Sequence, residues 1–359
     1  MIEDINQEVK IILANLYKKL NLPFKIIKQT SFKANDYSFC SEVKIKLGEE
    51  TKEYFLKIPK RDIAYIKSNE RDIFPITERD KELGKNEVES LKKLNKKILS
   101  SEININLIKF IYYSSSENLI ITEKIYGRDF FKILRKASLI KSFLYFPIKS
   151  VENNMFNLGK SLAVFSKKNE DIENIAEYKL NKSKINLYLK KISTKRNLFN
   201  YDNLFAKSEG KSSISSDGFK GLDIRNILID ELNQIYVLDP GKNKSEYAES
   251  NLARFITTLF IIFWGSFYFF IGFKTHKYYL DFFLKGFFSQ NVKINPTILD
   301  FEIKKEIIKH WELAIRALEN KKWNKYVSRL LKSFYIDKFY SSLILNSQIS
   351  FKSYIKARK

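Results

Sequence analysis

The first 125 residues alternate between apolar and polar positions, in short runs that are separated by turn-forming residues. An amphipathic pattern over 2–20 predicts an N-terminal helix, and a second amphipathic pattern predicts a helix over 86–94. Five further runs have the length and composition of β-strands. We expect these strands at 24–30, 39–47, 53–58, 107–113 and 119–125. The pattern therefore predicts an antiparallel sheet with a helix between its third and fourth strands.

Helical periodicity dominates after residue 125, with a helix over 157–166 and another that begins at Ala248. The run 255–273 contains no charged residue and is long enough to cross a bilayer. Polar interruptions and a break at Gly265-Ser266 favour a buried core helix over a membrane span. Two segments are expected on the surface: the charged stretch 59–85 as an exposed insertion, and the serine-rich stretch 208–218 as a flexible loop.

Two charged residues stand out against this apolar pattern. Lys57 lies inside the third predicted strand, where an isolated lysine usually indicates a sheet edge or a solvated face. Glu87 shares a helical face with Leu91 and Leu94, because the three are spaced at i, i+4 and i+7, whereas Glu89 points elsewhere. Glu87 can therefore point inward together with the leucines.

The segment 219–242 combines a turn, two short apolar strands and the polar hairpin tip 230–233. Asn226 stands just before the first strand and Asp239 just after the second, so a hairpin would bring these two positions to one end. An amide oxygen and a carboxylate are hard ligands suited to Mg²⁺, which usually binds one or two carboxylates and the phosphates of a substrate. An ordinary hairpin with polar ends is the alternative interpretation.

These features resemble the motifs of the protein-kinase-like superfamily, in its branch of aminoglycoside phosphotransferases and other small-molecule kinases. Asn226 and Asp239 match the metal-binding half of the loop H-G-D-x-x-x-x-N and the later Asp, whereas Phe219 and Gly221 replace the usual His and base Asp. Residues 121–130 are similar to the hinge, and residues 157–166 resemble a helix of the family that contains a glycine at Gly159.

The resemblance implies an α+β, bilobal protein-kinase-like fold. Its N-lobe, residues 1–124, would hold a five-stranded antiparallel sheet, the N-terminal helix and the Lys57/Glu87 helix. The C-lobe, residues 125–359, would be mostly helical and contain the catalytic loop 219–242. The gap of 62 residues from Gly159 to Gly221 suits a small-molecule phosphotransferase better than a protein kinase.

The family also implies roles for individual residues. Nucleotide contacts would come from Lys57, Glu87, Glu123, Ile125, Ser31 and Asn35. The metal ligands would be Asn226 and Asp239, and the catalytic residues would be Asp223, Arg225 and Lys220. Lys57, held by Glu87, would neutralise phosphates, and Lys220 or Arg225 would stabilise charge on the transferring group. Asp223 would serve as a displaced base. The turn 31–38 contains no glycine, so Ser31, Asn35 and backbone donors would have to reach the phosphate.

Composition adds few constraints. The 64 lysines and arginines exceed the 41 acidic residues and give a net charge of +23, which would suit an anionic partner. Because lysine, isoleucine and asparagine are abundant along the whole chain, compositional drift is the favoured explanation of this excess. The basic residues are spread along the whole chain without a nucleic-acid-binding module, so we expect no nucleic-acid partner. One cysteine, Cys40, and two histidines exclude an intrachain disulfide and disfavour a structural zinc site.

Two functional hypotheses follow from the sequence. The first is an ATP- and Mg²⁺-dependent phosphotransferase acting on a small-molecule, glycan or lipid-linked hydroxyl. The second is a pseudokinase-like module that binds nucleotide without turnover, which Gly221, Phe219 and the glycine-free turn favour. The acidic N-terminus shows no signal peptide, so we expect a cytoplasmic protein. Peripheral contact with the inner face of a membrane stays open.

Overall fold

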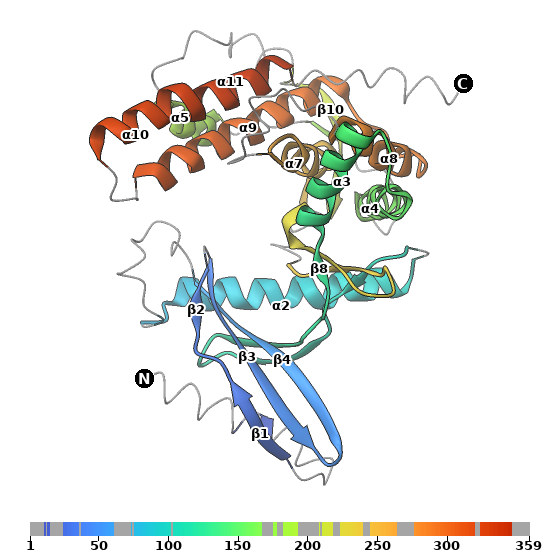
Figure 1. The fold of residues 1–359 in the computed structure, drawn as a ribbon, viewed down its shortest axis with the longest axis vertical. Coiled ribbons are helices and arrows are strands. Elements are labelled where there is room, and N and C mark those ends of the chain that lie inside the picture. Colours follow the sequence, from blue (N-terminus) through green and yellow to red (C-terminus); the bar gives the residue numbers. More distant parts are fainter. Residues whose placement is uncertain are drawn as a thin grey trace. The chain divides into compact units, whose positions relative to one another are not determined.

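The chain divides into two compact units, which are described separately (Figure 1). Unit 1 comprises 1–96 and 107–126, and unit 2 comprises 97–106 and 127–359. The computed structural model describes residues 11, 13–14, 24–35, 37–60, 73, 75–101, 103–166, 175–177, 182–192, 208, 210–217, 223–239, 245–263, 276–319 and 324–346. The predicted α+β, bilobal organisation is confirmed, because unit 1 holds an antiparallel sheet and unit 2 is mostly helical.

All strand pairs in the sheet of unit 1 are antiparallel. Its strands are β1 (Phe24–Gln29), β2 (Lys33–Ala34), β3 (Ser38–Leu47), β4 (Glu50–Pro59), β6 (Phe110–Ser114) and β7 (Leu119–Glu123). The strand order is β1-β3-β4-β7-β6, and β2 pairs with β3. The five expected strands are present, and β2 is a sixth that forms inside the turn 31–38. Gly48, with φ 61°, lies in the tight connection between β3 and β4.

The core of unit 1 lies on one face of this sheet. Alternate residues of β3 and β4 are buried there, namely Val43, Ile45, Leu47, Tyr54, Leu56 and Ile58. Because successive strand side chains point to opposite faces, Lys57 lies on the face away from this cluster. Leu13 is also buried in the cluster, although most of the expected N-terminal helix lies outside the described residues.

Helix α2 (Glu78–Leu99) begins eight residues earlier than the sequence pattern predicted. Its start is fixed by a capping box, in which the Thr77 N–H donates to Asp80 Oδ2 (2.9 Å) and the Asp80 N–H donates to Thr77 Oγ1 (3.2 Å). The expectation that all of 59–85 is an exposed insertion is therefore wrong for its last third, where Asp80 is buried. Residues 61–72 lie outside the described part of the chain.

A buried asparagine fixes α2 against the sheet. The Asn118 side chain donates to the carbonyl of Pro59 at the end of β4 (2.7 Å) and to the carbonyl of Asp80 in α2 (2.9 Å). Asn118 has φ 49°, a conformation that asparagine tolerates better than most residues. A Cβ on Gly84 would lie 2.0 Å from Asn118 Oδ1, so α2 requires glycine there. This contact sets where Glu87, one turn later, meets β4.

Unit 2 is built mainly from helices. These are α3 (Phe130–Leu144), α4 (Lys149–Ser166), α5 (Lys182–Lys191), α7 (Ala248–Phe260), α8 (His276–Phe288), α9 (Pro296–Glu319), α10 (Lys325–Leu331), the π-helical segment η6 (Lys332–Ile336) and α11 (Asp337–Asn346). Helices α4 and α8 lie side by side (Figure 1). A Cβ on Gly159 would lie 1.9 Å from the Phe283 carbonyl oxygen, and one on Gly286 would lie 2.0 Å from the Phe156 carbonyl oxygen. The glycine of the helix motif is therefore required by helix packing.

Short strands complete unit 2. One sheet contains β12 (Ile235–Val237), β11 (Ile227–Ile229) and β8 (Arg128–Asp129), and another contains β13 (Ser245–Tyr247), β10 (Ser212–Asp217) and β9 (Ile175–Glu177). A further short strand, β5 (Asn106–Leu107), lies where the chain passes between the units. The expected flexible loop over 208–218 is wrong for 212–217, because β9 and β13 supply backbone partners on both sides of β10.

The uncharged run 255–273 does not form one long helix in its described part. Helix α7 ends at Phe260, and the following residues to Phe263 form turns. All side chains from Phe255 to Phe263 are buried, and Phe255 stacks on Phe283 of α8 at 4.0 Å. This part of the run is core, as expected; 264–273 lie outside the described residues. Of the helices that the structure describes, none combines the length and apolar character needed to cross a membrane.

Candidate active site

The predicted pair of Lys57 and Glu87 forms an ion pair in unit 1. The Lys57 Nζ lies 2.6 Å from Glu87 Oε1, with side chains 18% and 10% exposed. Lys57 does not lie at a sheet edge, since β4 is hydrogen-bonded to β3 on one side and to β7 on the other. Buried ion pairs pay a desolvation cost that often cancels their attraction, so stability alone is a weak reason for this pair.

Glu87 reaches Lys57 because α2 turns one face toward the sheet. Val88, Leu91 and Leu94 of this face are buried, whereas Glu89 is exposed. The expected orientation of Glu87 toward the leucines is thus confirmed. The position of α2 itself depends on the buried Asn118 contact, which the sequence pattern did not indicate.

Cys40 is the neighbour of Lys57 on β3, where the two residues are paired across the strands. Ser38 and Asn35 side chains both lie 3.4 Å from Cys40 Sγ, and Asn35 donates through Nδ2. Burial raises the pKa of the Cys40 thiol and outweighs the opposite effect of Lys57. The thiol is therefore neutral at pH 7. The register that pairs it with Lys57 could have been predicted from the tight turn at Gly48.

The turn that was expected to cover a phosphate is a small hairpin of β2 and β3. The Asn35 N–H donates to the Ser38 carbonyl at 2.7 Å, which closes the turn. Ser31 and Asn35 are both exposed. Neither side chain is buried in the core, so both stay predicted phosphate contacts.

The predicted hinge, residues 123–125, begins at the last residue of β7. The N–H groups of Glu123 and Lys124 donate to the carbonyls of Lys109 (2.9 Å) and Glu53 (3.0 Å). An adenine edge would therefore need other backbone groups of this segment, such as the Ile125 N–H and the Glu123 carbonyl. Contacts of Glu123 and Ile125 with adenine stay predictions.

An ionic cluster holds the hinge at the sheet. Lys124 Nζ lies 2.8 Å from Glu42 and 3.1 Å from Glu53, and it also lies over the Tyr126 ring. Hydrogen bonds from Tyr126, Lys44 and Lys124 lower the pKa of Glu53 to about 2. The glutamate therefore stays ionised across the whole physiological range. No sequence pattern indicated this cluster.

In unit 2, the predicted hairpin brings Asn226 and Asp239 to one end. Strands β11 and β12 pair Ile227 with Val237, and the Leu238 N–H donates to the Asn226 carbonyl at 2.9 Å. Asp239 follows directly. Both side chains are half-buried. Such a pair of oxygen ligands fits Mg²⁺, which completes its coordination with phosphate oxygens and water. Among the described residues there is no cluster of three or more acidic, His or Cys side chains that could hold a metal alone.

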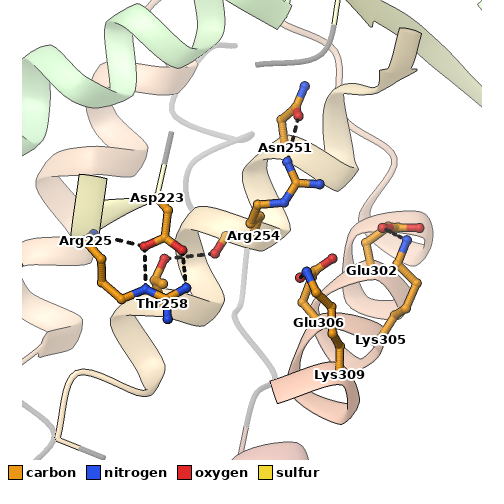
Figure 2. A network of polar contacts seen from close by, with 9 residues as sticks. All are labelled: Asp223, Arg225, Asn251, Arg254, Thr258, Glu302, Lys305, Glu306 and Lys309. Atoms are coloured by element: carbon orange, nitrogen blue, oxygen red, sulfur yellow. Dashed lines mark hydrogen bonds and ion pairs between the residues drawn. The ribbon is translucent and has the colours of Figure 1, made fainter. Parts of the chain in front are cut away.

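Asp223 caps the 3₁₀ turn η4 (Ile224–Asn226) that leads to Asn226. Its carboxylate accepts from the Arg225 N–H and from Arg225 Nε, both at 2.9 Å, and forms an ion pair with Arg225 Nη2 (Figure 2). Burial raises the pKa of Asp223, but the contacts with Arg225 outweigh it and hold this pKa below its usual value. A weakly basic carboxylate with several donors is a poor general base. Phe219, Lys220 and Gly221 lie outside the described residues.

Charged side chains of α7 and α9 belong to the same region of unit 2, and Glu302 and Glu306 are buried there. Figure 2 shows Arg254 and Thr258 of α7 near the Asp223–Arg225 pair, and the ion pairs Glu302–Lys305 and Glu306–Lys309 in α9. Burial raises the pKa of Glu306, but Lys309, Arg254 and Lys305 together hold it far below its usual value.

His310 belongs to the same region. Burial lowers its pKa to about 4, and the cations Arg225 and Lys309 contribute, against the opposite effects of Glu306 and Asp223. His310 is therefore neutral at pH 7. It is 85 positions from Arg225, and no spacing in the sequence indicated that they are close.

No family model matches this sequence, and no curated protein matches it. Among solved structures, a macrolide 2'-phosphotransferase from Brachybacterium faecium is similar at 11% identity and TM-score 0.49, covering 94% of this chain and 99% of that one. A choline kinase from Streptococcus pneumoniae has 11% identity, TM-score 0.45 and coverages of 93% and 99%. An ethanolamine kinase from Plasmodium vivax has 13% identity, TM-score 0.45 and coverages of 94% and 85%. These are small-molecule kinases, the branch that the sequence motifs resemble.

Proposed function

We propose that this chain is an ATP- and Mg²⁺-dependent phosphotransferase that acts on a hydroxyl group of a small molecule, a glycan or a lipid-linked acceptor. The observation that carries the proposal is the 2.6 Å ion pair between Lys57 on an interior strand and Glu87 on α2. A lysine in this setting offers a fixed positive charge to nucleotide phosphates, and the glutamate holds the ammonium in place.

Asn226 and Asp239 are the residues that would hold Mg²⁺. When bound, the metal would neutralise phosphate oxygens as charge develops in the transition state. The hairpin backbone fixes both positions, because the Leu238 N–H to Asn226 carbonyl bond locks the strand ends. Asp223 and Arg225 support this arrangement from positions three and one residues before Asn226, since their pairing shapes the turn that presents Asn226.

In the proposed reaction, the acceptor oxygen bonds to the γ-phosphorus while the bond to the β–γ bridging oxygen breaks and ADP leaves. The acceptor proton has to be lost as well. Because the Asp223 carboxylate is paired with Arg225, we propose that it acts as a positioning residue and that the proton passes to solvent or to the transferred group. Phosphoryl transfer through a loose transition state depends more on positioning and charge neutralisation than on a strong base.

A second candidate function is nucleotide binding without turnover. The same Asp223–Arg225 contacts favour it, since they occupy the carboxylate that was expected to act as the displaced base. Both candidates predict ATP binding that depends on Mg²⁺ and on Lys57. They differ only in whether phosphate is transferred.

The deciding experiment measures ATP affinity by calorimetry, with and without Mg²⁺, and then ADP release with a panel of acceptors. Aminoglycosides, macrolides, choline, ethanolamine, sugars and lipid-linked glycans form the first panel. Acceptor-dependent ADP release that disappears in Lys57→Met supports phosphotransfer. Mg²⁺-dependent ATP binding with no ADP release for any acceptor supports the second candidate, and absence of ATP binding contradicts both.

A further inference from the structure

The described C-terminal part of unit 2 exposes an apolar stripe that its own fold does not cover. Tyr326 and Leu330 of α10 and Phe334 of η6 follow one another at intervals of four residues and are 81%, 59% and 69% exposed. Side chains at this spacing lie on one side of a helix. We call these three residues the apolar stripe.

The next helical segment, α11, buries its aromatic side chains against a neighbouring helix. Phe339 and Tyr340 of α11 are buried, and Tyr340 stacks on Trp311 of α9. By contrast, every α10 side chain from Tyr326 to Leu331 whose burial is described is exposed or half-buried. Helical backbone continues from α10 through η6 into α11, so the stripe belongs to the same continuous helical segment as the buried Phe339 and Tyr340. Burial of an apolar face stabilises an amphipathic helix, so the exposed part of this segment is suited to an external partner.

The charge around the stripe identifies the chemistry of that partner. Residues 320–359 contain ten lysines and arginines and a single acidic residue, Asp337. Asp337 is buried and accepts a hydrogen bond from Trp311 Nε1 at 2.9 Å, so it does not offset the surface charge. Arg329, beside Leu330, and Lys338, four residues after Phe334, are exposed. An aromatic and aliphatic stripe with exposed cations beside it is typical of helices that lie on anionic membrane surfaces.

We propose that the apolar stripe docks on the surface of an anionic lipid bilayer, with the three side chains at the boundary of the acyl chains and Arg329 and Lys338 at the headgroups. A second copy of this chain fits the surface less well, because it would bring two basic stripes together and like charges repel. Independent of phosphotransfer, this docking would hold unit 2 next to membrane-borne molecules.

The test is co-sedimentation of the full chain with vesicles of phosphatidylcholine alone and with about one quarter phosphatidylserine. We expect binding to the mixed vesicles and little to the neutral ones. Arg329→Gln/Lys338→Gln should lower the partition coefficient about 30-fold, and the matched control Lys25→Gln/Lys28→Gln on β1 should change it far less. High salt should weaken binding, since it screens charges at a surface.

The apolar contribution is tested with Tyr326→Ser/Leu330→Ser/Phe334→Ser. We expect this variant to have a partition coefficient for the mixed vesicles that is about tenfold lower, or lower still. Its control is Phe143→Ser/Leu144→Ser/Phe146→Ser, at a similarly exposed apolar segment at the C-terminal end of α3. All six side chains are exposed, so both variants should fold, as circular dichroism will show.

Three outcomes would overturn the proposal. The first is equal binding to neutral and anionic vesicles or binding to neither. The second is loss of binding in the Phe143 control variant but not in the stripe variant. The third is dimerisation without vesicles that the stripe variant abolishes, which would make a second copy the partner.

Discussion

The Lys57–Glu87 and Asp223–Arg225 pairs are both short ion pairs, but they differ in what they join. The first connects a central strand to a helix 30 positions away in the sequence, and both side chains are largely buried. The second joins residues two positions apart within one turn, and the Arg225 side chain is half exposed. A local pair of this kind is explained by the turn that it caps, whereas a long-range pair between a strand and a helix needs an additional reason.

These two ion pairs show that the charge of a residue alone is a poor guide to a catalytic role. Asp223 is the carboxylate that the loop offers in place of the missing base, yet its contacts satisfy a backbone N–H and a neighbouring guanidinium. Its task is that of an N-cap. The Lys57–Glu87 pair has no such local explanation. Because a buried ion pair is often no more stabilising than well-packed apolar side chains, we expect the charge of Lys57 to serve a ligand.

The strongest test of this difference is Lys57→Met. Under the proposed function, turnover should fall by about 10²–10³-fold, because one positioned charge on the transferring phosphates is lost. The measurement is the steady-state rate of ADP release with saturating acceptor. Lys44→Met on the neighbouring strand is the matched control, since Lys44 pairs with Glu53 at the surface. Equal losses in both variants would contradict a specific role for Lys57.

Asp239→Ala tests whether unit 2 contributes to the same nucleotide site. We expect Mg²⁺-dependent ATP affinity to fall by about 100-fold, because loss of even an outer-shell partner of a metal ligand costs 10–100-fold. Calorimetric titrations with and without Mg²⁺ measure this effect. Asp230→Ala, at the opposite end of the hairpin, is the control. ATP affinity that is unchanged by Asp239→Ala would remove Asp239 from the metal site.

The pH dependence of stability tests the buried His310, which lies in the environment of the Asp223–Arg225 pair. The folded-state pKa of His310 is about 4, well below its usual value of about 6.5, so the unfolded chain binds more protons between these values. Stability should therefore fall as pH drops from about 6.5 to 4, by about 3 kcal/mol. Urea unfolding at a series of pH values measures this slope. His310→Gln should flatten it; an unchanged slope would show that His310 is not its source.

Asp223→Asn is expected to have the smallest effect. If Asp223 is a cap, the variant should lose about 1 kcal/mol of unfolding free energy and keep its turnover. A fall in turnover of about 10²–10⁴-fold would instead identify Asp223 as the base.

The same variant has a pH signature. The folded-state pKa of Asp223 is lowered, so its stabilisation is present above the unfolded pKa of about 3.9 and is lost as pH falls through the folded value. The stability difference between wild type and Asp223→Asn should therefore disappear in strongly acidic solution. Urea unfolding of the two proteins side by side measures this difference. A difference that stays constant would contradict an ionised cap.

Local sequence determined the five expected strands of unit 1, the helix that carries Glu87 and the β11–β12 hairpin. These elements follow from periodicity and turn residues, which act over a few neighbouring positions. The pairing of Cys40 with Lys57 also belongs to this category, because a tight turn at Gly48 sets the register of β3 and β4. The strand lysine and the helix glutamate could therefore be selected before the fold was known.

Other features depend on contacts between distant segments, and only the tertiary structure decided them. Asn118 places α2 against β4, and Gly159 is needed because the Phe283 carbonyl approaches it from another helix. The serine-rich β10 forms a strand because β9 and β13 offer it backbone partners, although its composition predicts a loop. His310 becomes part of the Arg225 environment only when α9 folds. No local pattern encodes such proximity, since burial, desolvation and close backbone approach arise only when segments remote in the sequence pack together.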